Sequence, residues 1–160
     1  MTQISLIGCG THVQKNLLSA FKRIEGLEIE GIYVRDDEKY QLFQEKYENI
    51  KKLSEIYKSE AKWAYVATPT HSHYALTKQC LLLGMNVVCE KPLTDSLERT
   101  ESLFNLAKQN GLRLVEVDMF THHKQYKNLK SLVDCNIELG SLSAQGVAMA
   151  AGLYRGVPIT

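Results

Sequence analysis

Short apolar runs alternate with amphipathic segments from residue 4 to residue 133 of the chain. Short apolar runs are typical of buried strands, whereas apolar residues three or four positions apart predict a helix with one buried face. Their alternation indicates an α/β fold, in which helices cover both faces of a parallel sheet. Strands are expected at residues 4–7, 27–34, 63–67, 86–89 and 112–116. Helices are expected at residues 13–24, 36–47, 70–83, 95–110 and 124–133, with a short helical turn at residues 53–57.

Glycines and capping residues indicate where these helices begin and end. Glycine adopts the left-handed conformation that ends many helices, and it follows three of them here, as Gly26, Gly84 and Gly111. Asp95 with Glu98 resembles a capping box at the start of the fourth helix. The side chains expected to face the sheet are Val13, Leu17, Leu18, Ala20, Phe21 and Ile24 in the first helix, and Leu97, Phe104 and Ala107 in the fourth.

The last part of the chain has a different character. After Gly140 the sequence is rich in Gly and Ala and carries one charged residue, Arg155. We predict a first domain over residues 1–138, and we interpret residues 139–160 as a tail or the truncated start of a second domain. An apolar tail together with an uncovered sheet edge favours a homo-oligomer.

The composition is that of a globular protein with a small-molecule ligand. The 160 residues suffice for one domain with a sizeable core, and the hydrophobic share of 44% is ordinary. A net charge of +1 gives no long-range preference for nucleic acid or an anionic membrane. No segment resembles a signal peptide or a membrane span, and the four cysteines are widely spaced. These features favour a cytoplasmic protein with reduced thiols.

A glycine segment, GCGTHV, lies between the first predicted strand and the first predicted helix. Gly8 would permit a tight turn there, and Gly10 would let the backbone approach a pyrophosphate in front of the helix amides. Val13 occupies the third glycine position of the G-x-G-x-x-G pattern, where a branched side chain alters the helix start. The alternative is a sharp turn without a ligand. The residues assigned to this part of the site are Gly8, Gly10, Thr11, His12 and Val13.

Arg35 and Asp36 follow the second predicted strand, where a dinucleotide's adenosine ribose is bound. A carboxylate there would accept hydrogen bonds from the ribose hydroxyls and favour NAD, whereas an arginine would neutralise a 2′-phosphate and favour NADP. Because Val34 is at the expected ribose position, Arg35 tilts the prediction slightly towards NADP. The alternative is a solvated helix start, at which Asp36 is only the N-cap.

Two further motifs follow the third and fourth predicted strands, ATPTHSH at residues 67–73 and EKPL at residues 90–93. With the glycine segment, they resemble the glucose–fructose oxidoreductase and inositol dehydrogenase (Gfo/Idh/MocA) family over residues 2 to about 142. The resemblance implies a Rossmann-type doubly wound parallel sheet that binds NAD or NADP. The three motifs follow parallel strands, so they are expected to meet at the edge where such sheets bind ligands.

The resemblance also implies roles for the EKPL residues. Glu90 and Lys91 are expected near the nicotinamide ribose and ring, and a cis peptide bond before Pro92 fixes where Lys91 points. Lys91 resembles the family's active-site lysine, whose ammonium polarises the substrate oxygen as hydride arrives. The alternative is a surface lysine in a loop.

The ATPTHSH residues are implied to lie along the cofactor. Thr68 and Pro69 line its path, and His73 matches a histidine that touches the nicotinamide side or the substrate. His71 is interpreted as a helix cap or a cofactor contact. The alternative for both histidines is an exposed helix start.

Two departures from the family pattern bear on function. Thr121-His122 replaces an Arg-Phe pair, which removes a nicotinamide or substrate contact. We interpret the chain as ending before the second α/β substrate domain that the resemblance implies, a domain that supplies most of the substrate pocket and an acid/base histidine. No metal site is predicted, because no subset of five candidate side chains has a ligand spacing. These candidates are His71, His73, Cys80, His122 and His123.

Together these features predict the cofactor domain of an NAD(P)-dependent oxidoreductase that transfers hydride on a sugar-like hydroxyl or carbonyl substrate. Such a domain is incomplete as a catalyst alone, since hydride transfer needs a held substrate in a water-poor pocket. The alternatives are a non-catalytic nucleotide-binding regulatory or sensor module and a truncated remnant. The fold cannot decide among them, because function depends on the site.

Overall fold

The computed structural model describes residues 1–47, 49–118, 121 and 123–134. Six strands form one sheet in the order β3-β2-β1-β4-β5-β6, and each neighbouring pair is parallel. The strands are β1 (Thr2–Ile7), β2 (Leu27–Tyr33), β3 (Lys52–Leu53), β4 (Trp63–Val66), β5 (Asn86–Cys89) and β6 (Leu114–Glu116). The predicted parallel sheet is confirmed.

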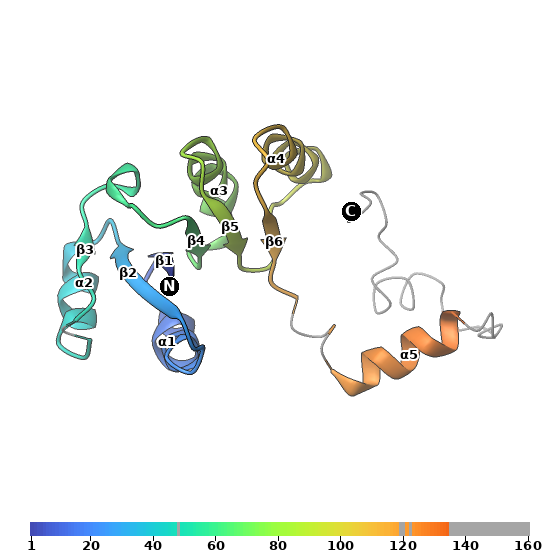
Figure 1. Ribbon diagram of the computed structural model, residues 1–160, viewed down its shortest axis with the longest axis horizontal. Coiled ribbons are helices and arrows are strands. Elements are labelled where there is room, and N and C mark those ends of the chain that lie inside the picture. Colours follow the sequence, from blue (N-terminus) through green and yellow to red (C-terminus); the bar gives the residue numbers. More distant parts are fainter. Residues whose placement is uncertain (48, 119–120, 122, 135–160) are drawn as a thin grey trace. The chain divides into compact units, whose positions relative to one another are not determined.

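Helices lie on both faces of this sheet, with α1 and α2 on one side and α3 and α4 on the other (Figure 1). They are the π-helical turn η1 (Val13–Leu17), α1 (Leu18–Phe21), α2 (Asp37–Gln44), the 3₁₀ turns η2 (Ile56–Lys58) and η3 (Thr70–Ser72), α3 (His73–Leu82) and α4 (Leu97–Gln109). Each face has its own buried cluster. One cluster includes Ile4, Leu6, Phe21, Ile32, Tyr40, Phe43 and Tyr65, and the other includes Ile7, Val66, Cys80, Leu81, Val87 and Leu103.

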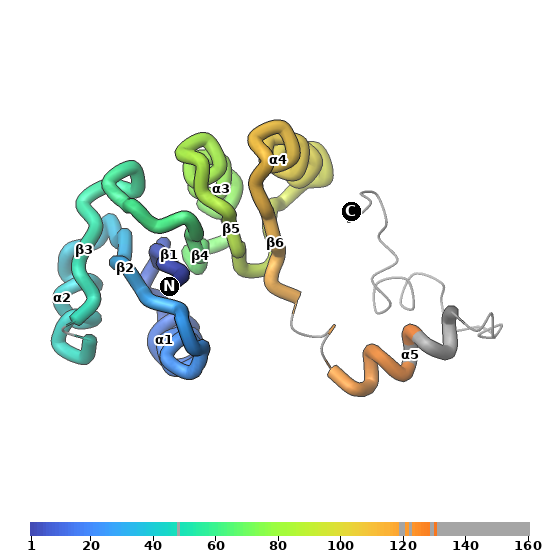
Figure 2. The backbone as a smooth tube through the Cα atoms, in the orientation of Figure 1, coloured from blue at the N-terminus to red at the C-terminus, as the bar shows by residue number. Residues whose placement is uncertain are grey.

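The chain order around β1 creates the switch point of a doubly wound sheet. Figure 2 traces the chain outward from β1 through β2 to β3, and then back across to β4 on the other side of β1. From β4 it continues outward through β5 to β6. Sheets of this kind bind ligands beside the carboxyl ends of the strands at the point where the order reverses, which here lies between β1 and β4.

The sheet and its four helices form one compact unit, Met1–Val117. A second unit begins at Asp118, and its described part includes α5 (Lys124–Asp134). The domain boundary predicted after residue 138, and the tail over residues 139–160, lie outside the described residues. In the described part of the chain, no helix is long and apolar enough to cross a bilayer.

The first helix differs from the prediction at both ends. It opens with the wide turn η1 at Val13, where the third glycine of the fingerprint was replaced by a branched residue. The Val13 side chain is fully buried in the core of the α1–α2 face. The helix ends at Phe21, so Ile24 lies beyond it and is 52% exposed, which contradicts the prediction that it faces the sheet.

The start of α4 was predicted one residue too early. Ser96, not Asp95, is the N-cap: its hydroxyl accepts a hydrogen bond from the Arg99 amide, while Asp95 pairs with the Arg99 guanidinium at 2.9 Å. Leu97 is therefore the first helical residue and is 59% exposed rather than packed on the sheet. Phe104 and Ala107 do pack against the core, as predicted.

The turn predicted at residues 53–57 is also different. Lys52 and Leu53 pair with Ile32 and Tyr33 as the edge strand β3, and the helical turn η2 starts only at Ile56. Pairing with β2 determines this strand, and an apolar pattern two residues long cannot predict it.

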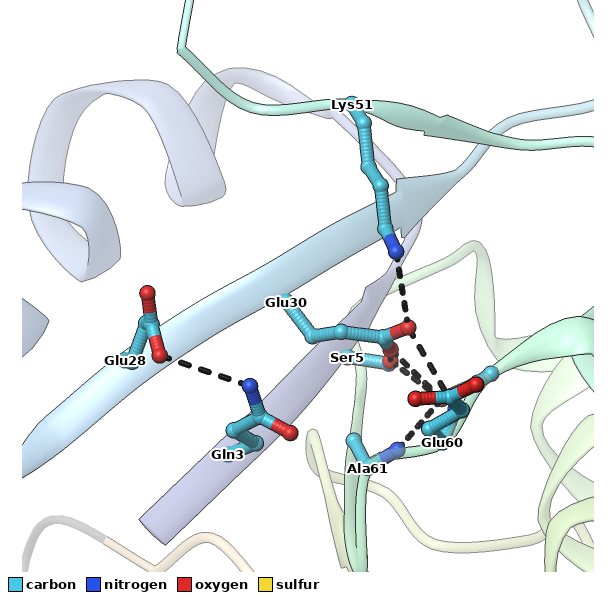
Figure 3. A network of polar contacts seen from close by, with 8 residues as sticks. Gln3, Ser5, Glu28, Glu30, Lys51, Glu60 and Ala61 are labelled. Atoms are coloured by element: carbon cyan, nitrogen blue, oxygen red, sulfur yellow. Dashed lines mark hydrogen bonds and ion pairs between the residues drawn. The ribbon is translucent and has the colours of Figure 1, made fainter. Parts of the chain in front are cut away.

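A buried acidic residue joins three segments on the α3–α4 face of the sheet. Ile4 pairs with Ile29 and Ser5 with Gly31, so Glu30 is the extra residue of a β-bulge in β2. Its side chain is only 5% exposed. Figure 3 shows its carboxylate surrounded by polar groups from β1, from the segment before β3 and from the segment before β4.

Each oxygen of the Glu30 carboxylate has donors. Oε2 accepts hydrogen bonds from the hydroxyls of Ser5, at 2.6 Å, and Ser59, at 2.7 Å. Oε1 lies 3.2 Å from the Lys51 ammonium and 3.3 Å from the Glu60 amide. Burial alone would raise the pKa of Glu30, but these hydrogen bonds outweigh it and lower the pKa from 4.5 to about 2. The ionised form is therefore the one that the fold stabilises.

Candidate functional site

The three sequence motifs meet at the carboxyl edge of β1, β4 and β5. The Ala67 amide donates to the Ile7 carbonyl, and the Glu90 amide donates to the Val66 carbonyl, both at 2.9 Å. The loops that follow the three strands are thus held side by side at the switch point. This juxtaposition was expected from the motif positions.

The two glycines of the first loop have different surroundings. Gly8 has a φ of +107°, and a Cβ there would lie 2.8 Å from the Ala67 carbonyl oxygen. The fold therefore requires glycine at this position. At Gly10 the backbone needs no positive φ, and within the described residues a Cβ would meet nothing within 4 Å. The protein itself gives no reason for glycine at this position, and the open space in front of it is where a pyrophosphate was predicted to approach.

The first helix begins at Val13, three residues after Gly10. Thr11 is exposed and Val13 is buried. Gln14 closes the loop behind the glycines, since its side-chain amide donates to the Cys9 carbonyl at 2.8 Å, and the Tyr47 hydroxyl donates to the Gln14 carbonyl at 2.9 Å. These two hydrogen bonds therefore fix the loop, while a Cβ at Gly10 would still meet no described atom within 4 Å.

Glu90 is held by two side chains from other elements. The Tyr65 hydroxyl of β4 donates to Glu90 Oε1 at 2.7 Å, and His12 Nε2 lies 3.0 Å from the same oxygen. His12 Nδ1 is in turn 3.1 Å from the Asn16 side-chain amide. Burial, and then the neighbouring carboxylate, raise the pKa of Tyr65 far above its usual value, so its hydroxyl keeps its proton.

Lys91 is exposed and forms no hydrogen bond or ion pair with the described residues. The Lys91–Pro92 peptide bond is cis, which confirms what the family resemblance implied. After it, the Leu93 amide donates to Glu116 Oε1 of β6 at 2.8 Å. The loop is thus anchored on both sides, and the lysine ammonium is left available to a ligand.

His73 lies inside the protein, beneath the loops. It is 1% exposed, and its Nδ1 and Nε2 lie 2.7 Å from the carbonyl oxygens of Pro92 and Thr68. A carbonyl oxygen only accepts, so a ring nitrogen that carries hydrogen donates to the oxygen in front of it. Both ring nitrogens thus face carbonyl oxygens of the two motif loops, and the ring lies between these loops.

Three other ATPTHSH residues differ in burial. Thr68 is half-buried, Pro69 is exposed, and the Thr68 hydroxyl accepts a hydrogen bond from the buried Ser72 hydroxyl at 2.8 Å. His71 is exposed in the η3 turn, and its side chain forms no hydrogen bond with the residues that the structure describes.

A pocket of about 370 Å³ opens at the ends of β2 and β3. It is lined by Tyr33, Val34, Arg35, Asp37, Lys52 and Ser54. Arg35 forms no hydrogen bond or ion pair with the described part of the chain, whereas Lys52 pairs with Asp37. Asp36 caps α2 by accepting from the Lys39 amide and also pairs with the Lys39 ammonium at 3.0 Å, which lowers its pKa. The capping role given as the alternative for Asp36 is therefore present.

Two residues of this region were missed by sequence reasoning. Tyr65 reads as one more apolar residue of a buried strand, and only its hydroxyl at Glu90 shows another role. Lys52 lies in the two-residue strand β3 and carried no motif signal.

No metal centre is found among the residues that the structure describes, since no three His, Cys, Asp or Glu side chains are grouped to hold an ion. Cys9, Cys80 and Cys89 are buried free thiols. His122, one of the histidines considered as a metal ligand, lies outside the described residues.

The motifs, the doubly wound sheet and the glycine loop are typical of dinucleotide-binding domains. Residues 2–119 match the family model described as "Oxidoreductase family, NAD-binding Rossmann fold" (GFO_IDH_MocA), and the chain belongs to this family.

Relatives of known activity match the chain over most of its length. It is 30% identical over 137 residues to a dTDP-3,4-didehydro-2,6-dideoxy-alpha-D-glucose 3-reductase of Streptomyces violaceoruber, a match that covers 82% of this chain and 40% of that protein. It is also 30% identical over 134 residues to the scyllo-inositol 2-dehydrogenase (NADP(+)) IolU of Bacillus subtilis, over 81% and 40% of the two chains. The chain thus spans well under half the length of these relatives.

Solved structures agree with this assignment. The 3-ketoreductase KijD10 of Actinomadura kijaniata, in complex with NADP and TDP-benzene, is similar with a TM-score of 0.74 and 26% identity. The similarity covers 83% of this chain and 42% of KijD10.

Proposed function

We propose that this chain binds NADP(H) and is the cofactor domain of an oxidoreductase that transfers hydride on a hydroxyl or carbonyl group of a sugar-like substrate. The observation that carries the proposal is the open space at Gly10, in a loop that precedes the first helix and contacts Glu90 through His12. Relatives that act on deoxysugar nucleotides and inositol support the substrate class.

The chain's own groups fit the cofactor at two points and the substrate at one. The amides at the first helix start face the pyrophosphate position, and their partial positive charge stabilises an anion there. Arg35 supplies a guanidinium that forms no hydrogen bond or ion pair with the described residues, and the two neighbouring carboxylates are paired, Asp36 with Lys39 and Asp37 with Lys52. A bound NADP supplies the hydride acceptor, and NADPH the donor. The Lys91 ammonium donates a hydrogen bond to the substrate oxygen and stabilises the negative charge that develops on it during reduction.

Calorimetric titration of the purified chain with NADPH and with NADH tests this function. Saturable binding with a preference for NADPH supports it. The absence of binding by either cofactor would refute it and favour a remnant, whereas binding without turnover in any complete assembly would favour the regulatory or sensor module. Self-association stays a prediction, and light scattering of the purified chain measures it.

Arg35→Ala is expected to weaken NADPH binding about tenfold and to leave NADH binding unchanged, because only NADPH carries the 2′-phosphate that the guanidinium would pair with. The affinities are measured by the same titration. Arg113→Ala removes an exposed arginine outside the pocket and serves as the control. Equal losses for both cofactors would show that Arg35 does not contact a 2′-phosphate.

Lys91→Ala is expected to lower kcat at least about 100-fold in an assembly that turns over, since it removes the donor to the oxygen on which charge develops. Binding of NADPH should change less than about twofold, because Lys91 acts on the substrate. Steady-state kinetics and titration give the two values, and Lys108→Ala, an exposed residue of α4, is the control. Undiminished turnover with intact cofactor binding would exclude Lys91 from the chemistry.

A further inference from the structure

The Glu90 carboxylate uses its two oxygens unequally. Oε1 accepts from the Tyr65 hydroxyl at 2.7 Å and lies 3.0 Å from His12 Nε2. Oε2 makes no hydrogen bond or ion pair within the described part of the chain, although the side chain is only 17% exposed. A carboxylate with one oxygen fixed by two donors and the other free is oriented to accept a further donor.

Both donors to Oε1 are themselves held in place. The Tyr65 ring is 5% exposed and packs edge-on against Phe21 of α1, with ring centroids 5.5 Å apart. The His12 ring is fixed by Asn16, one helical turn further on. A single neutral tautomer satisfies both contacts of the ring, since Nε2–H donates to Glu90 while Nδ1 accepts from the Asn16 amide. The arrangement is therefore complete before any ligand is bound.

The position of this arrangement indicates its ligand. Since β4 lies between β1 and β5, the contact from His12 to Glu90 passes over the carboxyl end of β4, beside the switch point. It therefore connects the loop that faces the pyrophosphate position with the strand end that carries Lys91. The group between these two places in a dinucleotide is the ribose attached to the nicotinamide, and its neighbouring hydroxyls are the donors that a carboxylate accepts.

We propose that Tyr65 and His12 are positioning residues that fix Oε1 of Glu90, so that Oε2 accepts a hydrogen bond from a hydroxyl of the ribose next to the nicotinamide. This inference rests on the proposed function. Tyr65 and His12 touch neither the cofactor nor the substrate in this role. They hold the Glu90 carboxylate in one orientation before the cofactor binds. Cofactor binding is therefore not weakened by the entropy cost of ordering a mobile Glu90 side chain.

The test compares two ligands that share the adenosine half. NADPH carries the nicotinamide riboside, whereas adenosine 2′,5′-diphosphate does not. Tyr65→Phe removes the hydroxyl but keeps the ring against Phe21. We expect it to weaken NADPH binding about 5- to 10-fold and to leave binding of adenosine 2′,5′-diphosphate unchanged. NADH and AMP replace the two ligands if the wild-type chain prefers NADH.

A second variant pair tests His12 separately. His12→Leu is expected to weaken NADPH binding about fivefold, and His12→Gln to restore most of it, because the glutamine amide can still donate to Glu90. Tyr74→Phe is the matched control: it also removes a tyrosine hydroxyl, but one whose contact is Ser102 of α4 at 3.4 Å. This control should bind both ligands as the wild type does.

The outcomes separate this inference from the proposed function. If the wild-type chain binds neither ligand, the proposed function fails. If the wild type binds both, and Tyr65→Phe and His12→Leu bind NADPH as tightly as the wild type, the positioning role is wrong. An equal loss for both ligands would also overturn it, because it would show general damage to the sheet edge.

Discussion

Replacing Glu30 by Ala is expected to lower the free energy of unfolding by about 2–4 kcal/mol, which is a large share of the stability of a small domain. The variant removes the acceptor of four donors, from Ser5, Ser59, Glu60 and Lys51. Those donors come from three segments distant in sequence, and hydrogen bonds to a charged acceptor with little exposure are among the stronger ones. Urea denaturation followed by circular dichroism measures the change.

The control for this variant lies two residues earlier in the same strand. Glu28 is exposed and contacts the Gln3 side chain at 3.4 Å. Glu28→Ala removes a carboxylate of the same kind and is expected to change the free energy of unfolding by less than about 0.5 kcal/mol. If the two variants lose the same amount, the buried network of Figure 3 does not stabilise the fold.

The same carboxylate gives the fold a dependence on pH. The pKa of Glu30 is about 2 in the folded chain and is expected near its ordinary value of 4.5 in the unfolded chain. A depressed pKa means that its contribution is fully present above pH 4.5 and is lost as the pH falls towards 2. Glu30→Gln lacks this titration, so the difference in stability between wild type and variant should shrink over that window.

Much of the fold follows from local patterns that the sequence displays. Apolar runs predicted β1, β4 and β5, because most residues of these strands are buried or half-buried on both faces of the sheet. Glycines at helix ends predicted the turns at Gly26, Gly84 and Gly111, and all three have positive φ.

The features that were missed depend on contacts between distant residues. The strand β3 exists only because Lys52 and Leu53 pair with β2. The Glu30 bulge cannot be read from LEIEGIY, since an acidic residue in a strand usually indicates an exposed position. Its burial becomes favourable only when Ser5 and Ser59 are brought beside it.

The candidate site also has a part that the sequence predicted and a part that it did not. Motif spacing predicted which loops meet, because parallel strands place their carboxyl ends at one edge. It did not predict how the side chains pair within that edge. His12 and Glu90 were assigned separately to the cofactor and in fact contact one another, and His73 is buried between two carbonyl groups. Such pairings depend on distances that no motif encodes.

Gly8→Ala is expected to lower the stability of the fold, whereas Gly10→Ala is expected to weaken cofactor binding. At Gly8 the new Cβ would meet the Ala67 carbonyl at 2.8 Å, and the φ of +107° is one that alanine rarely adopts. Neither backbone can yield without separating β1 from β4, so we expect a loss of about 3 kcal/mol in the free energy of unfolding. At Gly10 neither strain nor a clash arises, so the stability should stay within about 1 kcal/mol of wild type.

The Gly10 variant should nevertheless bind NADPH at least about tenfold more weakly, because its methyl group would occupy the space through which the pyrophosphate reaches the helix amides. Gly26→Ala is the control for backbone strain alone, since Gly26 has a φ of +77° with nothing near its Cβ position in the described part of the chain. Thermal unfolding and titration together distinguish the three variants. A Gly10→Ala chain that folds and binds NADPH as tightly as wild type would show that a pyrophosphate does not need glycine at this position. The open space at Gly10 would then no longer support the proposed function.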